Sequence, residues 1–405
     1  MRSVSSLAMQ AEGEEMTATT RAVILGLAAI LIGLPLPTWA FFFWHVVPDG
    51  HPDFRANYTA GYMVRTGKPL YDFALESEVQ TSTVPVKSLD EVAPFIHPAY
   101  EALVYVPLSL LSYLQAYWVW FSVNLIILVC VYYLLRPELS ALSAVTPWLP
   151  AASFAAFLPI GAAMVQGQDS LLVLLPFAAA FAYFRDSKRL WVSGILLGLT
   201  VFRFQIFIPI VLCFLFWRRW KVVVGSLLTA LAAAVLSILV AGFRPYVETL
   251  LGLSVKPELA SWNTYLQPAW RMPNLRGLIQ SLGGSDWIVL VASLTIMAIA
   301  VLAGKRSELQ QQFSLAIVLA VLVSYHCFVH DLSILFIPLA LLIGTKQQAA
   351  LGIIGVCFFT PTLIAFIPEQ SYLAVFAVLA LFAFLATDLM HSGKYAHRQV
   401  STVAP

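Results

Sequence analysis

Long apolar runs separated by short polar connections dominate the pattern along the chain. Runs that are long enough, or nearly long enough, to cross a bilayer occur at 22–46, 115–135, 143–163, 169–184, 189–202, 204–217, 221–242, 286–303, 310–325, 331–344, 348–366 and 371–390. A spanning helix needs ~20 apolar residues, and tilting or polar helix ends make up the difference in the shorter runs. The segment 98–112 contains two prolines and fits either a short span or an interfacial helix. The pattern predicts an all-α polytopic membrane protein with about 12 transmembrane helices.

The composition supports a membrane protein. Of the 405 residues, 60% are hydrophobic and only 11% are charged, which is more apolar surface than a soluble domain of this length can bury. The net charge of +2 is no signature of nucleic-acid binding. The 4 cysteines are dispersed without CxxC spacing, so they predict neither a disulfide framework nor a zinc site. The first run continues into aromatic residues rather than a small-residue cleavage site, so we expect a retained anchor.

Basic residues in the short connections indicate which side faces the cytoplasm. If the runs alternate, one side receives Arg21, Arg136, Arg185, Lys188, Arg189, Arg218, Arg219, Lys221, Lys305, Arg306, Lys346, Lys394 and Arg398. By the positive-inside rule this side is cytoplasmic, and it includes the tails 1–21 and 391–405 around a membrane domain 22–390. The opposite side of the cell membrane then receives the large loops 47–97 and 243–285, and most polar residues that have no solubilising role. No internal repeat of the kind found in many transporters is visible.

The loop after the first run carries a candidate base. Phe54, Tyr58 and Tyr62 recur at i, i+4 and i+8, which predicts an amphipathic helix lying on the bundle. Asp53 stands at the start of this helix, either as a simple cap or as a general base beside a membrane cavity. The turn GKPLYD would end the helix, and Asp72 in it is either a second cap or a binding group.

Two further outer segments contain candidate substrate-binding side chains. His97 precedes a proline, so it either belongs to a simple turn or contributes to a site. Gln166 and Gln168 lie in an outer connection, where amides could hydrogen-bond sugar hydroxyls. The alternative is a tight loop in which Asp169 or Ser170 caps the next helix.

Arg203 and Gln205 interrupt an apolar stretch between Gly194 and Trp217. An arginine at membrane depth costs ~2.5–3.5 kcal/mol on insertion scales, so it usually faces a cavity or a partner. Snorkelling from a helix end is the cheaper alternative. With no acid nearby in the sequence, we favour an anion site, because the guanidinium fork suits a phosphate.

His326, His330 and Asp331 share a narrow outer turn between two runs. Two histidines and an acid could bind a metal, but no third ligand of a recognisable pattern accompanies them, so we predict no metal. Contact with a phosphate leaving group is the better chemical use of these imidazoles. The loop 243–285 mixes aromatic and amide side chains, which suits either a sugar-binding surface or an interfacial aromatic anchor.

Together these segments resemble glycosyltransferase family 87, membrane enzymes of GT-C type that use polyprenyl-phosphate sugars, some of them α-mannosyltransferases. The resemblance rests on DFRANYTAGYMVRTGKPLYD, FIHPAYEALVYVPLSLL, QGQDSLLVLLP, GLTVFRFQIFIPIVL and SYHCFVHDLSILFIPL, in this order over about 45–345. It implies that Asp53 matches the catalytic base of the first extracytoplasmic loop. Arg203 stands where the family often has lysine, and His330 matches a histidine of a late outer turn. The PP often found after the first loop is HPAY here.

The resemblance implies a GT-C-type bundle whose extracytoplasmic loops form the active site. Its donor would be a polyprenyl-phosphate-linked hexose, most simply mannose, and its acceptor a lipid-linked or envelope glycan. We expect inversion at the sugar carbon and no cofactor or nucleic-acid partner, with membrane lipids as surroundings. The expected phosphate ligands are Arg203, His330 and His326, and the expected substrate-binding residues are Tyr58, Tyr62, Asp72, His97, Gln166, Gln168, Gln205 and Asp331. A transporter or lipid flippase, and a non-catalytic scaffold, are the alternatives.

Overall fold

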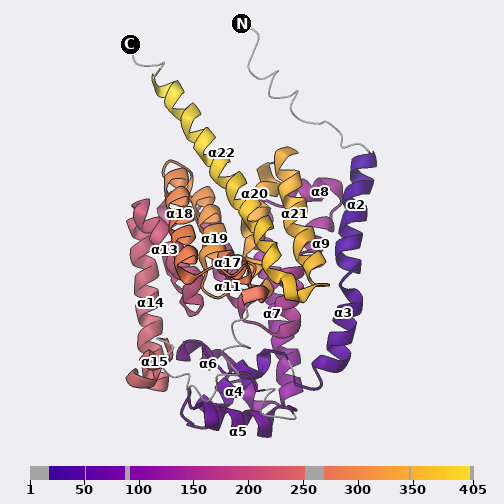
Figure 1. Ribbon diagram of the computed structural model, residues 1–405, viewed down its shortest axis with the longest axis vertical. Helices are drawn as coiled ribbons and strands as arrows, with labels where there is room; N and C mark the ends of the chain where they lie inside the picture. Colours follow the sequence, from indigo (N-terminus) through magenta and orange to yellow (C-terminus); the bar gives the residue numbers. More distant parts are fainter. Residues whose placement is uncertain (1–17, 51, 87–91, 251–268, 346–347, 402–405) are drawn as a thin grey trace.

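The computed structural model describes residues 18–50, 52–86, 92–250, 269–345 and 348–401, and every regular element within these ranges is a helix. Long helices form one bundle, and shorter helices close one end of it (Figure 1). The start of α2 (Ala18–Gly33) and the end of α22 (Val375–Ser401) lie at the opposite end. The short helices and the two chain ends therefore occupy opposite ends of the molecule.

The helices of the bundle follow one another in the order of the predicted runs. They are α3 (Leu36–Phe41), η1 (Phe42–Val46), α7 (Tyr113–Leu135), α8 (Ser140–Val145), α9 (Leu149–Ala156), α10 (Leu158–Gln166), α11 (Ser170–Tyr183), η4 (Ser187–Arg189), α12 (Leu190–Gly198), η5 (Val201–Arg203), α13 (Phe204–Phe216), α14 (Trp220–Ala241), α17 (Leu275–Ser281), α18 (Asp286–Gly304), α19 (Leu309–Val323), η8 (Val329–Leu335), α20 (Phe336–Thr345) and α21 (Gln348–Ile364). The short elements are α4 (Phe54–Arg65), α5 (Phe73–Thr83), α6 (Ala99–Tyr105), η3 (Leu108–Leu110), α15 (Phe243–Leu250), η7 (Ala269–Arg271) and η9 (Pro368–Ala374).

The predicted polytopic helical membrane protein is confirmed. Within the described ranges, five helices are long and apolar enough to cross a membrane: Ala18–Val46, Tyr113–Leu135, Trp220–Ala241, Asp286–Gly304 and Pro368–His391. Two bent pairs raise this number to as many as seven, namely Leu149–Ala156 with Leu158–Gln166 and Leu190–Gly198 with Val201–Phe216, bent by 65° and 66°. The larger number predicted from the sequence also includes four shorter apolar helices, and the runs 189–202 and 204–217 meet in a single bent pair.

At the bend between α12 and α13 the chain reverses, so that α13 runs back toward the end of the bundle where α12 starts. A Cβ on Gly194 would lie 2.5 Å from the Val222 carbonyl oxygen, and a Cβ on Gly198 would lie 2.5 Å from the Thr229 Cβ. These contacts pair increasing residue numbers, so α12 and α14 run in the same direction and pack closely through small residues. Because α14 starts directly after α13, α13 must bring the chain back. Arg203 therefore sits at the bend, inside the protein.

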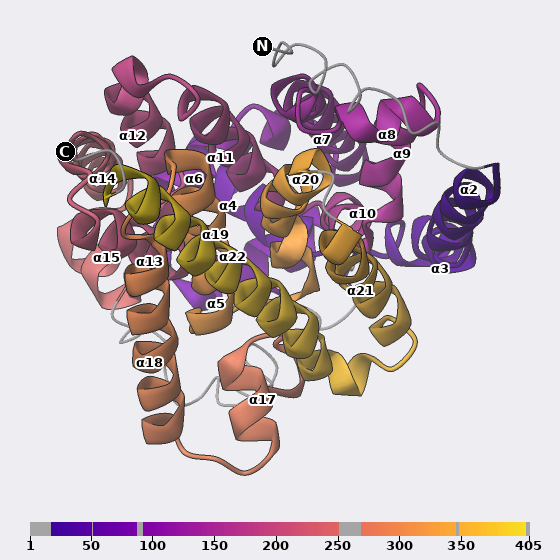
Figure 2. The ribbon, with the colours of Figure 1, turned by 90° about the horizontal axis from the view of Figure 1, so that it is seen from above.

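The centre of the bundle is α19, whose residues from Phe313 to Leu322 are buried without a break. A helix that is apolar on all sides belongs in the interior rather than at the lipid face. Seen from above, α19 lies near the middle of the bundle, whereas α2 and α3 stand at its edge (Figure 2). The buried α19 fixes the position of the outer turn that follows it.

The amphipathic helix predicted after the first run is α4. Phe54 and Tyr58 are buried among the aromatic rings of α6 and α7, and the Tyr58 hydroxyl donates to the Leu111 carbonyl at 2.9 Å. Gly67, at φ +67°, ends α4 as predicted. Asp72 caps α5, because its Oδ1 accepts from the Leu75 N–H at 3.2 Å. Of the two predicted roles of Asp72, helix cap or binding group, the structure shows the cap.

Residues 98–112 form α6 and η3, and neither element is among the candidate spans. α6 lies against α4 at the closed end of the bundle (Figure 1). The contact is close, since a Cβ on Gly61 would meet the Tyr105 backbone at 2.5 Å. This packing brings the residues before α6 next to the start of α4.

Candidate functional site

A cavity of about 450 Å³ lies between the short helices and the ends of the bundle helices. Its volume is within the range of small-molecule sites, roughly 300–1,000 Å³. The lining comes from distant parts of the chain: Asp53, Arg55, Ala56, Asn57, Val92, Ala93, Pro94, Ile96, His97, Ala162, Gln166, Gln168, Arg203, Arg271, His326, Phe328, Val329, His330, Pro368 and Ser371. Several of the predicted outer segments therefore meet at one place.

The cavity lining is rich in basic groups. It contains the three arginines Arg55, Arg203 and Arg271, together with three histidines. Among the lining residues that the structure describes, Asp53 is the one carboxylate. A ligand that combines an anionic group with a reactive hydroxyl would suit such a lining.

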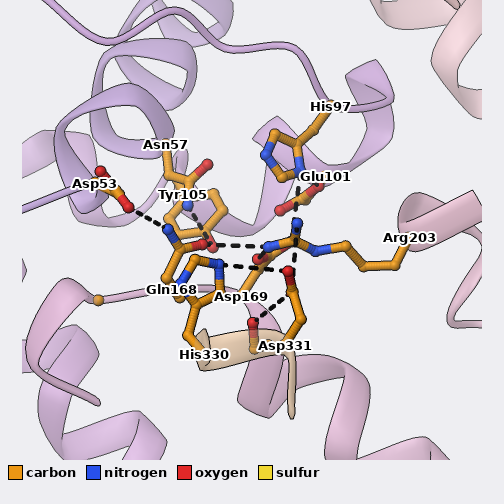
Figure 3. A network of polar contacts seen from close by, with 12 residues as sticks. Asp53, Asn57, His97, Glu101, Tyr105, Gln168, Asp169, Arg203, His330 and Asp331 are labelled. Carbon is orange, nitrogen blue, oxygen red and sulfur yellow. Dashed lines mark hydrogen bonds and ion pairs between the residues drawn. The ribbon is translucent and has the colours of Figure 1, made fainter. Parts of the chain in front are cut away.

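Asp53 stands at the N-cap position of α4 but does not cap it with its side chain. Instead its Oδ2 accepts a hydrogen bond from Gln168 Nε2 at 2.5 Å (Figure 3). Its backbone N–H donates to Gln166 Oε1 at 3.4 Å. The predicted cap is thus replaced by contacts with the predicted amide turn, and both amides hold Asp53 rather than standing free.

The turn that carries Gln166 and Gln168 is fixed by its own backbone. Gly167 adopts φ +62°, the left-handed conformation in which glycine is favoured, and ends α10. The Trp120 Nε1–H donates to the Gly167 carbonyl at 3.0 Å, and the Tyr117 hydroxyl donates to the Val165 carbonyl at 2.7 Å. Two side chains of α7 therefore hold the turn against the start of α4.

Arg203 is buried and bound to carboxylates. Its Nη2 donates to Asp169 Oδ1 and, at 3.2 Å, to Gln168 Oε1. Its Nη1 lies 3.7 Å from Asp331 Oδ1. Gln168 thereby links the Asp53 carboxylate to the Arg203 guanidinium (Figure 3). Arg203 also lines the cavity and is only 6% exposed, so the structure favours the cavity-facing prediction over snorkelling.

His97 is held by two acids. Its Nδ1 lies 3.0 Å from Glu101 Oε2 and 3.4 Å from Asp169 Oδ2. Burial alone would lower the pKa of His97, but Glu101 and Asp169 outweigh burial and raise that pKa from 6.5 to about 10. The two carboxylates therefore favour the imidazolium form of His97. Sequence reasoning gave Glu101 no role, although its i, i+4 spacing from His97 was visible.

The outer turn between α19 and α20 contributes His326 and His330 to the lining. His330 Nε2 lies 3.7 Å from Asp331 Oδ2, and that oxygen also accepts from the Phe328 N–H at 2.8 Å. Asp331 Oδ1 accepts from the Ser170 hydroxyl at 3.2 Å. Burial lowers the pKa of His326 to about 4, so its ring is neutral at physiological pH.

Metal-ligating atoms come together once in the part of the chain that the structure describes. The side chains of His97, Glu101 and Asp169 have ligand atoms within 4.8 Å of one another. Arg203 already contacts Asp169, and His97 Nδ1 lies 3.0 Å from Glu101 and 3.4 Å from Asp169. We therefore interpret the group as an ion-paired cluster in which His97 and Arg203 face two carboxylates. His326, His330 and Asp331 do not form such a group.

Other predicted substrate-binding residues lie outside the cavity lining. Tyr58 packs among aromatic rings, Tyr62 lies beneath the Arg65 guanidinium at 4.9 Å, and Asp72 caps α5. Gln205 lies on α13, half-buried.

Among the charged and amide side chains of the lining, three had no role predicted from the sequence. They are Arg55, Asn57 and Arg271. The first two follow Asp53 by two and four residues, and this closeness was the available signal. Of the aromatic segment predicted within 243–285, residues 251–268 lie outside the described ranges.

Comparison with known proteins gives the chain a family. Residues 95–329 match glycosyltransferase family 87, and this range includes His97, Gln168 and Arg203. No curated protein and no solved structure matches the chain. Asp53 precedes the matched range, so its position rests on the cavity geometry. Because the match covers more than half of the chain, the protein belongs to glycosyltransferase family 87 and is a membrane glycosyltransferase.

Proposed function

We propose that the protein is a hexosyltransferase that moves a hexose, with mannose as the first candidate, from a polyprenyl-phosphate donor to a lipid-linked or envelope-glycan acceptor. The reaction takes place on the extracytoplasmic side of the cell membrane. One observation carries the proposal: a cavity at the end of a membrane bundle combines a single lining carboxylate with several basic side chains.

The donor phosphate lies against the basic part of the lining, and its prenyl tail stays among the apolar helices. Arg203 and His330 are the proposed phosphate ligands, with His326 beside them. A guanidinium next to a leaving phosphate stabilises the negative charge that grows as the bond to the sugar breaks. The apolar outer surface of the bundle suits a donor whose tail remains in the lipid.

Asp53 is the proposed general base. It takes the proton of the acceptor hydroxyl, whose oxygen forms a bond to the anomeric carbon. The bond between that carbon and the phosphate oxygen breaks, and its electron pair leaves with the polyprenyl phosphate. Gln168 occupies one Asp53 oxygen, so the other remains for the acceptor.

One nucleophilic displacement at the anomeric carbon inverts the configuration of that carbon. Retaining glycoside hydrolases, which also break a bond at the anomeric carbon, use a second carboxylate as nucleophile, about 5–5.5 Å from the first. Asp53 is the one carboxylate of the described lining, which supports inversion.

The proposed side of the membrane follows from the basic connections. Arg185 pairs with Glu138 at 2.5 Å, two residues before α8, and α8 lies at the end of the bundle where α2 starts (Figure 1). By the positive-inside rule that end is cytoplasmic, so the cavity end faces outward. Membership of a glycosyltransferase family favours this enzyme over the transporter or flippase alternative.

Asp53→Asn tests the proposed base. The amide is nearly the same size and can still accept from Gln168, but it cannot take a proton. We expect the purified variant to lose activity by ~10²–10⁴-fold, the usual contribution of a general base. Asp72→Asn is the matched control, because it makes the same change at a helix cap outside the cavity. Full activity of Asp53→Asn would remove Asp53 from the mechanism.

A further inference from the structure

We propose that His97 is a cationic ligand of the donor phosphate, and that Glu101 and Asp169 are positioning residues that hold its ring from behind. The inference rests on the proposed function and names one more residue of the donor site. Its ligand class is a lipid-linked phosphate monoester or diester. The geometry of the ring and the placement of the surrounding charges carry the inference.

The first step is the orientation of the ring. Both carboxylates contact Nδ1, at 3.0 Å and 3.4 Å, and neither Glu101 nor Asp169 is part of the cavity lining. His97 itself does line the cavity, and neither carboxylate contacts the opposite edge of the ring, which carries Nε2. Figure 3 shows the second ring nitrogen turned away from Glu101.

The second step is the rigidity of the ring. The Phe95 ring stacks on the imidazole with centroids 5.5 Å apart. The Tyr71 hydroxyl donates to the His97 carbonyl at 2.7 Å, which fixes the backbone. A donor held this firmly loses little conformational entropy when a ligand arrives.

The third step is the charge on the ring. The charged and titratable groups around it are Glu101 on α6, Asp169 before α11, Arg203 at the bend and His326 in the outer turn. The two carboxylates dominate and keep His97 protonated through neutral pH. A protonated ring cannot accept the proton of an acceptor hydroxyl, so these charges favour a role as anion ligand over a role as base.

The fourth step is the layering of charge. The cations Arg203 and His97 reach the lining, whereas Glu101, Asp169 and Asp331 lie behind them. A phosphate on this side of the cavity is therefore closer to Arg203 and His97 than to these three acids, and Coulomb energy falls with distance. Arg203 Nη2 is committed to Asp169 and Gln168. The His97 Nε2–H has no such protein partner among the described residues.

Binding of a short polyprenyl phosphate, farnesyl phosphate, to the full-length protein in detergent tests the inference directly. We expect His97→Gln to weaken binding by at least ~10-fold, the loss typical of a charge-assisted hydrogen bond. The matched control is His45→Gln, an exposed histidine on η1, which should bind like the parent. Thermal unfolding of each variant reports whether the fold is intact.

Glu101→Gln provides a second test of the inference, in which His97 itself is unchanged. Without Glu101 the pKa of His97 falls toward 6.5, so the charge is lost at lower pH than in the parent. We expect Glu101→Gln to bind farnesyl phosphate weakly at pH 8 and to recover near pH 5.5. A purely structural defect would not recover on acidification.

The outcomes separate the inference from the proposed function. If the parent binds farnesyl phosphate and His97→Gln, correctly folded, binds equally well, the inference is wrong while the proposed donor stands. If the parent does not bind farnesyl phosphate, the proposed donor class fails, and the inference fails with it. Equal competition by inorganic phosphate at the same concentration would overturn the assignment to a lipid-linked phosphate.

Discussion

Arg203→Met should lower the stability of the fold as well as the rate of transfer. The guanidinium contacts Asp169 and lies 3.7 Å from Asp331, and both acids are buried. Breaking a buried pair by removing one partner costs ~3–5 kcal/mol, because the remaining charge is left without compensation. In the variant Asp169 Oδ2 still has His97 Nδ1 at 3.4 Å. Asp331 Oδ2 still accepts a hydrogen bond from the Phe328 N–H at 2.8 Å. These remaining contacts place the expected loss near the lower limit, about 3 kcal/mol, or ~10² in the folding equilibrium.

Denaturant unfolding of the purified protein in detergent, followed by circular dichroism, measures this loss. Adding Asp169→Asn to Arg203→Met should recover part of the stability, because the uncompensated charge is then gone. The control is Arg189→Met, a 59% exposed arginine whose surface pair is worth ~0–1 kcal/mol. Arg203→Lys should fold and transfer weakly, since it keeps the charge and loses the paired fork. If Arg203→Met proved as stable as the parent, the buried charge balance described above would be refuted.

Two further predictions concern topology and helix packing. A cysteine at Ser82 should react with a membrane-impermeant reagent in intact cells, and a cysteine at Lys221 only after permeabilisation; the reverse pattern would invert the proposed sidedness. Gly198→Val should lower the stability of the detergent-solubilised protein by ~1–3 kcal/mol, because α12 and α14 leave no room for a side chain. Gly352→Val is its control, since no heavy atom outside its own helix lies within 4 Å of a Cβ placed on Gly352. Equal losses of stability in both variants would contradict the packing argument.

The pattern of apolar runs was enough to locate the main helices. The runs 115–135, 221–242 and 286–303 correspond to α7, α14 and α18 within a few residues. The break in the run 143–163 was missed, although Pro150 and Pro159 are positioned at the starts of α9 and α10, where proline is tolerated. The runs 189–202 and 204–217 did place a break at Arg203, where η5 separates α12 from α13.

The sequence was enough to predict which segments form the candidate site, but not which of their side chains contact one another. Asp53, His97, Gln166, Gln168, Arg203, His326 and His330 were all singled out from the sequence, and all seven line one cavity. The partners of Arg203 were not foreseen. No acid lies near it in the sequence, yet Asp169, 34 residues away, contacts it directly. Such pairs arise from tertiary packing and leave no local signal. The chemical role of Asp53 stays a prediction.

The contact between Gly167 and Phe54 sets a spacing for the whole site. A Cβ on Gly167 would lie 2.7 Å from the Phe54 Cβ, so the amide turn and the start of α4 touch almost backbone to backbone. The residue before Phe54 carries the candidate base, and the residue after Gly167 links that base to Arg203. Ordinary van der Waals contact is 3.4–4 Å, so any side chain at position 167 would force the two halves of the site apart. The absence of one side chain thus fixes the distance between the candidate base and the arginine proposed to bind the phosphate.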